Sequence, residues 1–282
     1  MAVNGFLSEM GGLVLATGWL ILVCTLVEWI SPQSPFRWRD RWPGILFGLL
    51  VPVFALIVSS PLRHFWGWIG VPPVLHLGGL ALFGAPGAIL LMLLVSDFLA
   101  YWEHRFEHRF LWPVHAVHHS VEELSAATSF SHPLQFISMF FLIALPLSLV
   151  DFGPHAMPSV VVLITGLLQL YIHSPTRIHF GPLRHLFVDS RYHRIHHSLE
   201  ERHFDRNFSI LFSFWDRLFG TCVMPQPGEW PRTGIHEAPS PRSLAELLAF
   251  PFRLWRRRPP PARNLDSTAL QPAVPDANRQ AA

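Results

Sequence analysis

Histidines are the residues of this chain that could do chemistry, and 17 of its 282 residues are of this type. Five of them lie between positions 104 and 119, and three more between positions 193 and 197. The first two are four residues apart, and each of the two triplets that follow has the spacing i, i+3, i+4. On a helix, residues at these intervals share a face about 6 Å apart. The eight are His104, His108, His115, His118, His119, His193, His196 and His197.

Several neutral imidazoles around one point are typical of a site for a borderline transition metal such as iron, zinc, copper or nickel. Eight imidazoles exceed the needs of one tetrahedral ion, so the count favours two. A single HxxxH pair arises often by chance, and histidine-rich tags are low-complexity runs. Here the histidines alternate with large apolar residues such as Trp102, Phe106 and Ile195. The three clusters together therefore predict a metal centre.

The first pair must be positioned by the apolar run Gly87 to Ala100, which leads into it without a helix breaker. Asp97, Tyr101, His104 and His108 then form one stripe of a helix. A carboxylate inside an apolar helix is costly and is usually functional or paired. We expect Asp97 to be a catalytic residue of the outer shell, which orients a ligating imidazole through a hydrogen bond. The alternative is an aspartate at a helix end that reaches water.

Half of the chain is hydrophobic and its mean hydropathy is +0.32, which is high for a soluble protein. Gly11 to Ile30 is long enough to cross a bilayer as a helix. Ile45 to Ser59 is a second, shorter run interrupted by Pro52, and the two together predict a hairpin. Val71 to Pro86 is rich in Pro and Gly, which favours an interfacial or re-entrant segment.

Two further apolar runs, Leu134 to Val150 and Met157 to Tyr171, predict a second membrane hairpin over 134–171. Arginines at 37–41 and 105–109 would lie on the same side as the histidines, and only Arg63 would lie on the other side. The positive-inside rule therefore predicts that the histidines face the cytoplasm. We expect a multi-pass protein of the inner membrane of a bacterium, with its catalytic face cytoplasmic. The N-terminus lacks the positive region of a secretory signal.

The expected fold class is all-α: an integral membrane protein with transmembrane helical hairpins and a cytosol-facing helical cap that carries a multi-histidine dinuclear metal site. Four parts are expected along the chain. They are N-terminal transmembrane helices with the interfacial segment (1–96), a catalytic domain that includes the second hairpin (97–221), a peripheral C-terminal segment (222–258) and a disordered tail rich in Pro and Ala (259–282).

Other functions fit the composition poorly. A formal charge of +2 is too small for a nucleic-acid-binding surface, so nucleic acid is not an expected partner. Cys24 and Cys222 are isolated, which gives neither a disulfide framework nor a CxxC metal pair. The sequence has no GxGxxG loop and no CxxC-rich iron–sulfur tract, so any electrons must come from a separate protein.

The stretches SDFLAYWEHRFEHRFLWPVHAVHHS, SHP, FGPLRHLF, RYHRIHH and FWDRLFGT, between about Asp97 and Thr221, are specific. Through them the chain resembles the sterol desaturase and fatty acid hydroxylase superfamily of integral membrane di-iron oxygenases. The resemblance implies an all-α membrane fold, two iron ions that zinc can replace on purification, and O2 as co-substrate. It also implies hydroxylation or desaturation of a lipid (sterol, fatty acyl or related), with electrons from a reductase, ferredoxin or cytochrome type of partner.

By position, the resemblance implies the eight histidines above as ligands, with His173 as a further one and His132, in the SHP sequence, as a weaker candidate. Some positions depart from the family pattern. Phe130 stands where an arginine is usual, Gln135 where a glutamate commonly follows, and His203 where an acidic residue is common. Asp189 and Ser190 replace Thr-Pro. These departures leave the expected ligand set intact and bear on the substrate.

Two other classes remain as alternatives. The first is a membrane metalloprotein without redox chemistry, such as a zinc hydrolase or a metal carrier. The HExxH pair of zinc peptidases is missing, because Arg105 follows His104. The second is bis-histidine haem electron transfer, which needs single histidines on separate helices rather than triplets. The isolated histidines are interpreted as bystanders: His64, His76, His155, His179, His185 and His236.

Overall fold

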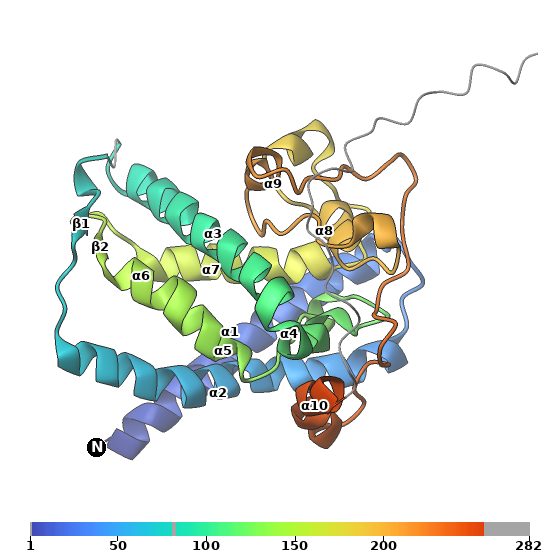
Figure 1. The fold of residues 1–282 in the computed structure, drawn as a ribbon, viewed down its shortest axis with the longest axis horizontal. Helices are drawn as coiled ribbons and strands as arrows, with labels where there is room; N and C mark the ends of the chain where they lie inside the picture. Colours follow the sequence, from blue (N-terminus) through green and yellow to red (C-terminus); the bar gives the residue numbers. More distant parts are fainter. Residues whose placement is uncertain (1, 81–82, 257–282) are drawn as a thin grey trace, which may run out of the picture.

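The computed structural model describes residues 2–80 and 83–256, so the tail expected at 259–282 lies outside the described residues. The described chain is mostly helical, with only two strands of two residues each, as expected (Figure 1). Its elements in order are α1 (Ala2–Ile30), α2 (Trp38–Ile69), β1 (Leu75–His76), η1 (Gly78–Leu80), α3 (Ala85–Phe110), α4 (Trp112–His119), η2 (Ala126–Thr128), α5 (Gln135–Met139), the π-helix η3 (Phe140–Ala144), α6 (Leu145–Ser148), β2 (Val150–Asp151), α7 (Pro158–His173), η4 (Gly181–His185), α8 (Ser190–His196), η5 (Glu201–His203), α9 (Phe214–Leu218) and α10 (Leu244–Arg256).

Among the described residues three helices are long and apolar enough to cross a membrane: the segments Leu7–Ile30 of α1, Gly44–Ile69 of α2, and the whole of α3. Large apolar side chains on the outer faces of α1 and α2 are exposed, among them Leu15 at 68% and Trp68 at 81%. Such faces are suited to lipid rather than to water. The chain is therefore a multi-pass membrane protein.

The second helix is longer than the sequence predicts. Pro52 lies inside α2 and does not end it, and the helix continues ten residues beyond Ser59. It stops at Gly70, whose left-handed φ of 71° lets its backbone N–H bond Trp66 O at 3.3 Å. The apolar run Ile45 to Ser59 is therefore the middle of a longer helix. The segment after Ser59 is polar only at Ser60, Arg63 and His64, and it continues the helix at the far end of the bundle.

The second hairpin is built from short helices. The run α5, η3 and α6 covers 14 residues and α7 covers 16, fewer than a spanning helix needs. Its tip nevertheless reaches the connection between α2 and α3, because β1 pairs in parallel with β2 and Trp66 Nε1 donates to Ser148 Oγ at 2.9 Å. This ribbon lies at the left of Figure 1, at the opposite end of the bundle from α8 and α9. The hairpin therefore runs the length of the bundle.

The other end of the bundle is a cap of short helices. α3 ends at Phe110, Leu111 is not helical, and Pro113 in the first turn of α4 starts the new helix at an angle. The helix α10 packs on α4 through Leu247 and Phe250. Asp189 caps α8, because its side chain accepts the backbone N–H of Tyr192. The cap thereby brings α3, α4, α7 and α8 together.

Candidate metal centre

Among the described residues nine histidines converge inside the cap in two groups, and within each group one ring nitrogen of every histidine lies within 4.8 Å of the others. All nine are buried except His108, which is half-buried. We call the groups centre 1 and centre 2. Centre 1 consists of His104, His108, His115, His119 and His196, and centre 2 of His118, His173, His193 and His197.

Each triplet is divided between the two centres. In α4 the outer members, His115 and His119, belong to centre 1, and the middle member, His118, belongs to centre 2. At the end of α8 the outer members, His193 and the capping residue His197, belong to centre 2, and the middle member, His196, belongs to centre 1. Positions i and i+4 are about 40° apart around a helix, whereas i+3 is turned about 100° from i+4. The spacing alone suggested that each triplet converges on a single point. In the structure each triplet instead supplies rings to both centres.

The spacing of the ring nitrogens fits a metal ion. Successive Nε2 atoms in each group are 3.1 to 3.2 Å apart: His104 to His115, His115 to His119, and His119 to His108 in centre 1, and His118 to His173, His173 to His193, and His193 to His197 in centre 2. Two nitrogens bound at about 2.1 Å to one ion lie about 3.0 Å apart at a right angle and about 3.4 Å apart at the tetrahedral angle. The observed separations lie between these values.

The hydrogen bonds of the ring Nδ1 atoms also fit a metal ion at each centre. Four histidines donate Nδ1–H to a backbone carbonyl at 2.6 to 3.1 Å: His104 to Phe208, His118 to Phe130, His173 to Gln169 and His196 to Arg206. A carbonyl only accepts, so a neutral ring bonded in this way has a bare lone pair on Nε2. The Nε2 atoms of His118 and His173 therefore face each other with two lone pairs, which a cation between them would satisfy.

Burial keeps the rings of the cap uncharged. It lowers the pKa of His115 to about 3, with a further contribution from His173. It also lowers the pKa of His118 to about 3, helped by its neighbour His115. The pKa values of His193 and His197 fall well below the ordinary value for the same reason, burial first and neighbouring histidines second. Neutral imidazole is the form that binds metal.

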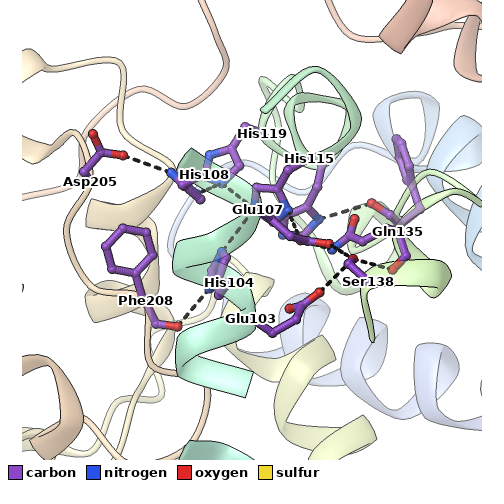
Figure 2. A network of polar contacts seen from close by, with 12 residues as sticks. Glu103, His104, Glu107, His108, His115, His119, Gln135, Ser138, Asp205 and Phe208 are labelled. Atoms are coloured by element: carbon purple, nitrogen blue, oxygen red, sulfur yellow. Dashed lines mark hydrogen bonds and ion pairs between the residues drawn. The ribbon is translucent and has the colours of Figure 1, made fainter. Parts of the chain in front are cut away.

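A carboxylate network supports centre 1 from the side of α5 (Figure 2). Glu107 Oε2 lies 2.7 Å from His115 Nδ1, and Gln135 Nε2 donates to the same oxygen at 2.7 Å. Ser138 Oγ contacts both Glu107 and Glu103. All of these polar side chains are buried. Contacts of this kind fix the ring orientation of a ligating histidine.

Sequence reasoning missed these carboxylates. Glu103 and Glu107 precede His104 and His108 by one residue each and repeat their i, i+4 spacing, which was the available signal. Their partners Gln135 and Ser138 come from α5, a contact that no local pattern reveals.

The loop that follows α8 supports centre 1 from the other side. Asp205 Oδ1 lies 3.2 Å from His108 Nδ1, and Arg206 O accepts the proton of His196. Asp205 and Asn207 both have a φ of 57°, and Asn207 anchors the loop by donating to Tyr192 O and Val223 O. Asparagine and aspartate tolerate this left-handed conformation better than most residues.

Two expected site residues lie elsewhere. The oxygens of Asp97 accept the backbone N–H groups of Leu211 and Phe212 at 2.9 and 2.8 Å, so Asp97 anchors a loop and does not orient an imidazole. His132 belongs to neither centre. Its Nδ1 accepts the Leu134 N–H, and its Nε2 lies 3.3 Å from Leu248 O. Both of its nitrogens are therefore engaged outside the centres.

A cavity of about 20 Å³ touches centre 1 at His108, His119 and His196. It has room for about one water-sized molecule. The cavity is also lined by His236, which the sequence predicts to have no role in the site. The ring Nε2 of His236 lies 3.2 Å from Leu199 O. Among the described residues His236 belongs to neither group of histidines.

The chain is similar in sequence to known monooxygenases and hydroxylases. Residues 89–221 match the family model for fatty acid hydroxylase. The chain is 27% identical over 209 residues to alkylglycerol monooxygenase from Homo sapiens, covering 72% of this chain and 45% of that protein. It is 32% identical over 169 residues to ornithine lipid hydroxylase OlsE from Rhizobium tropici, covering 58% and 50%. It is 30% identical over 211 residues to methylsterol monooxygenase 1 from Gallus gallus, covering 68% and 65%.

The chain spans less than half the length of the alkylglycerol monooxygenases that it matches. No solved structure matches it with significance.

Proposed function

We propose that this chain, as a member of the sterol desaturase and fatty acid hydroxylase superfamily, is a membrane-bound di-iron oxygenase that acts on a lipid. It would use O2 and external electrons to hydroxylate or desaturate a sterol, fatty acyl or related lipid. The observation that carries the proposal is the pair of buried histidine groups in which successive Nε2 atoms lie 3.1 to 3.2 Å apart.

Centres 1 and 2 would each hold one iron ion, and His132 would hold none. The ions, when bound, would supply the redox chemistry that couples O2 to oxidation of a C–H bond. The chain itself orients the rings: backbone carbonyls fix the Nδ1–H tautomer of four histidines, and Glu107 fixes His115. Burial excludes bulk water from the rings.

The lipid would approach along the outer face of α3. A groove of about 560 Å³ runs there, lined mainly by apolar side chains such as Trp102, Phe106 and Leu142. Glu103, which also lines it, is in the network that reaches His115. The names of the relatives support a lipid substrate, since they include an ornithine lipid hydroxylase and a methylsterol monooxygenase. A separate reductase, ferredoxin or cytochrome would donate the electrons.

The centres would face the cytoplasm at the inner membrane of a bacterium. Arg37, Arg41 and Arg105 lie at the end of the bundle that carries the histidines, and Arg63 lies near the opposite end. This asymmetry is the orientation that the positive-inside rule favours.

The proposal is tested by supplying expressing cells with heavy-isotope O2 and comparing their lipids with those of cells that express His118→Ala. We expect a lipid that is heavier by one labelled oxygen, or one that has lost two hydrogens, only with the native chain. A metal-loaded, folded protein that consumes no O2 with lipid and reductant, and that changes no lipid, would favour the zinc hydrolase or metal carrier instead.

A further inference from the structure

A third group of metal-ligating side chains lies outside centres 1 and 2. Glu200, His203 and Glu229 place one donor atom each within 4.8 Å of one another. Two segments distant in sequence supply them, and backbone contacts hold these segments together. Ser198 forms a β-bridge with Thr233, and the neighbouring Leu199 N–H bonds Arg232 O at 3.0 Å. The group is thus built by the fold and not by one flexible loop.

His203 is the unusual member of this group. It is 1% exposed, yet neither ring nitrogen has a hydrogen-bond partner within the described chain. Its Nε2 points toward Glu229 Oε1 at 3.5 Å, which is too long for a hydrogen bond. Burial lowers the pKa of His203, and the adjacent Arg202 lowers it further. A buried ring beside a carboxylate, with neither nitrogen in a hydrogen bond, is a polar group that calls for a partner.

We propose that Glu200, His203 and Glu229 form a third metal site, which binds a divalent ion of the zinc type. One imidazole and two carboxylates are a donor set that zinc accepts, with water in the fourth position. Calcium and magnesium prefer all-oxygen sites, so the imidazole disfavours them. Glu229 is already positioned, because its Oε2 accepts the Gln226 N–H at 2.7 Å, and its Oε1, which also accepts from Arg202, lies 3.5 Å from His203 Nε2.

Arg202 competes with the ion for the same carboxylates. Its Nε donates to Glu200 Oε2 at 2.8 Å and its terminal nitrogen donates to Glu229 Oε1. The side chain is 59% exposed, so it can move into solvent when an ion binds. The arginine adds no ligand and repels a cation. Its removal should therefore strengthen binding, whereas removal of His203 or Glu229 should weaken it.

The site would stabilise the loop that orients two histidines of centre 1. Only one residue separates His203 from Asp205, which contacts His108, and Arg206 O accepts the proton of His196. An ion that joins Glu200 and His203 to Glu229 would fix the beginning of this loop to the segment around residue 229.

The test is zinc binding by the full chain in detergent, measured by equilibrium dialysis at buffered free zinc followed by metal analysis. The variants are His203→Asn, Glu229→Gln and Arg202→Gln, with the exposed His185→Asn as control. Each must stay monodisperse and retain the zinc bound by centres 1 and 2. We expect one further equivalent in the native chain. His203→Asn and Glu229→Gln should weaken it at least about tenfold, and Arg202→Gln should tighten it about fivefold. The control should bind as the native chain does.

The proposal is overturned if the native chain has no equivalent beyond centres 1 and 2, or if His203→Asn keeps it. An extra equivalent in Arg202→Gln alone would also overturn it for the native protein, because the guanidinium would then be the resident cation. Excess magnesium or calcium should not displace the third zinc, and displacement by either would contradict the proposed ion class.

Discussion

At the scale of the residue, the two nitrogens of a histidine have different tasks. In His104, His118, His173 and His196, Nδ1–H donates to a backbone carbonyl, which leaves the Nε2 lone pair for a metal ion. His118 belongs to centre 2 and His196 to centre 1, so each should be needed by a different ion. We predict that His118→Ala and His196→Ala each lower metal content from about two ions per chain toward one, a stoichiometry taken from the two groups. Metal analysis after anaerobic iron reconstitution measures this.

The exposed His185→Ala should retain the full metal content and serves as the control. Full metal and full activity in both variants would mean that the buried histidines are structural, and the oxygenase proposal would fail with them.

Glu107→Gln should weaken iron binding about 10- to 100-fold, because it removes the carboxylate that fixes His115. Glu103→Gln is the matched control. It changes the same group four residues away, on a side chain that contacts Ser138 and Glu107 but no ligand ring. Competition with a chelator measures both affinities. Equal losses in the two variants would show that the network acts as a whole and not through His115.

The metal-free protein should lose stability in acid. His115 and His118 have pKa values of about 3 when folded and an ordinary value of 6.5, so the unfolded chain binds more protons between these limits. The free energy of unfolding therefore falls as pH drops below about 6.5, by up to about 1.4 kcal/mol per pH unit for each ring. Tryptophan fluorescence during thermal unfolding should show it. A metal-free double variant, His115→Gln with His118→Gln, should have a flatter pH dependence, and an unchanged slope would contradict the argument.

At the scale of the element, the sequence predicts which histidines form the two centres but not which centre each histidine belongs to. Helical spacing and resemblance together name all nine residues of the two centres. The division of each triplet depends on how α4 and α8 are rotated against each other, which is decided by distant packing such as that of α10 on α4. For the same reason the partners of Glu107 and Asp97 could not be predicted, since they come from α5 and from the loop before α9.

Asp97 illustrates the difference between a correct position and a wrong role. It is buried and paired, as its place in an apolar helix predicts, but its partners are the backbone N–H groups of Leu211 and Phe212. In Asp97→Asn one acceptor oxygen becomes a donor, which leaves a buried N–H unpaired. We predict a loss of about 1 to 3 kcal/mol of stability with metal retained by the folded fraction. Thermal unfolding measures the loss.

Asp151→Asn, at the exposed tip of the second hairpin, is the control and should be close to native. A native melting temperature for Asp97→Asn, combined with impaired turnover, would instead support the original expectation that Asp97 acts on the metal site.

At the scale of the whole molecule, the pairing of β1 with β2 fixes the position of the second hairpin in the bundle. It places the tip of the second hairpin beside the α2–α3 connection, at the end opposite the histidines. We predict that alkaline phosphatase fused at position 155 is active, and therefore outside the cytoplasm, whereas the same fusion after Arg256 is inactive. A green fluorescent protein fusion at each site gives the reciprocal signal. Activity at neither site would mean that the hairpin does not reach the far side.

The division of the triplets has a thermodynamic consequence. Because α4 and α8 each supply ligands to both centres, an ion that fixes either helix at one centre also positions a ring for the other. The second ion then binds ligands that are already ordered, so it loses less free energy to conformational entropy. The binding equilibria of the two ions are therefore positively coupled. Iron should fill the centres cooperatively, with a Hill coefficient above one. Half-loaded molecules should be scarce at every stage of reconstitution.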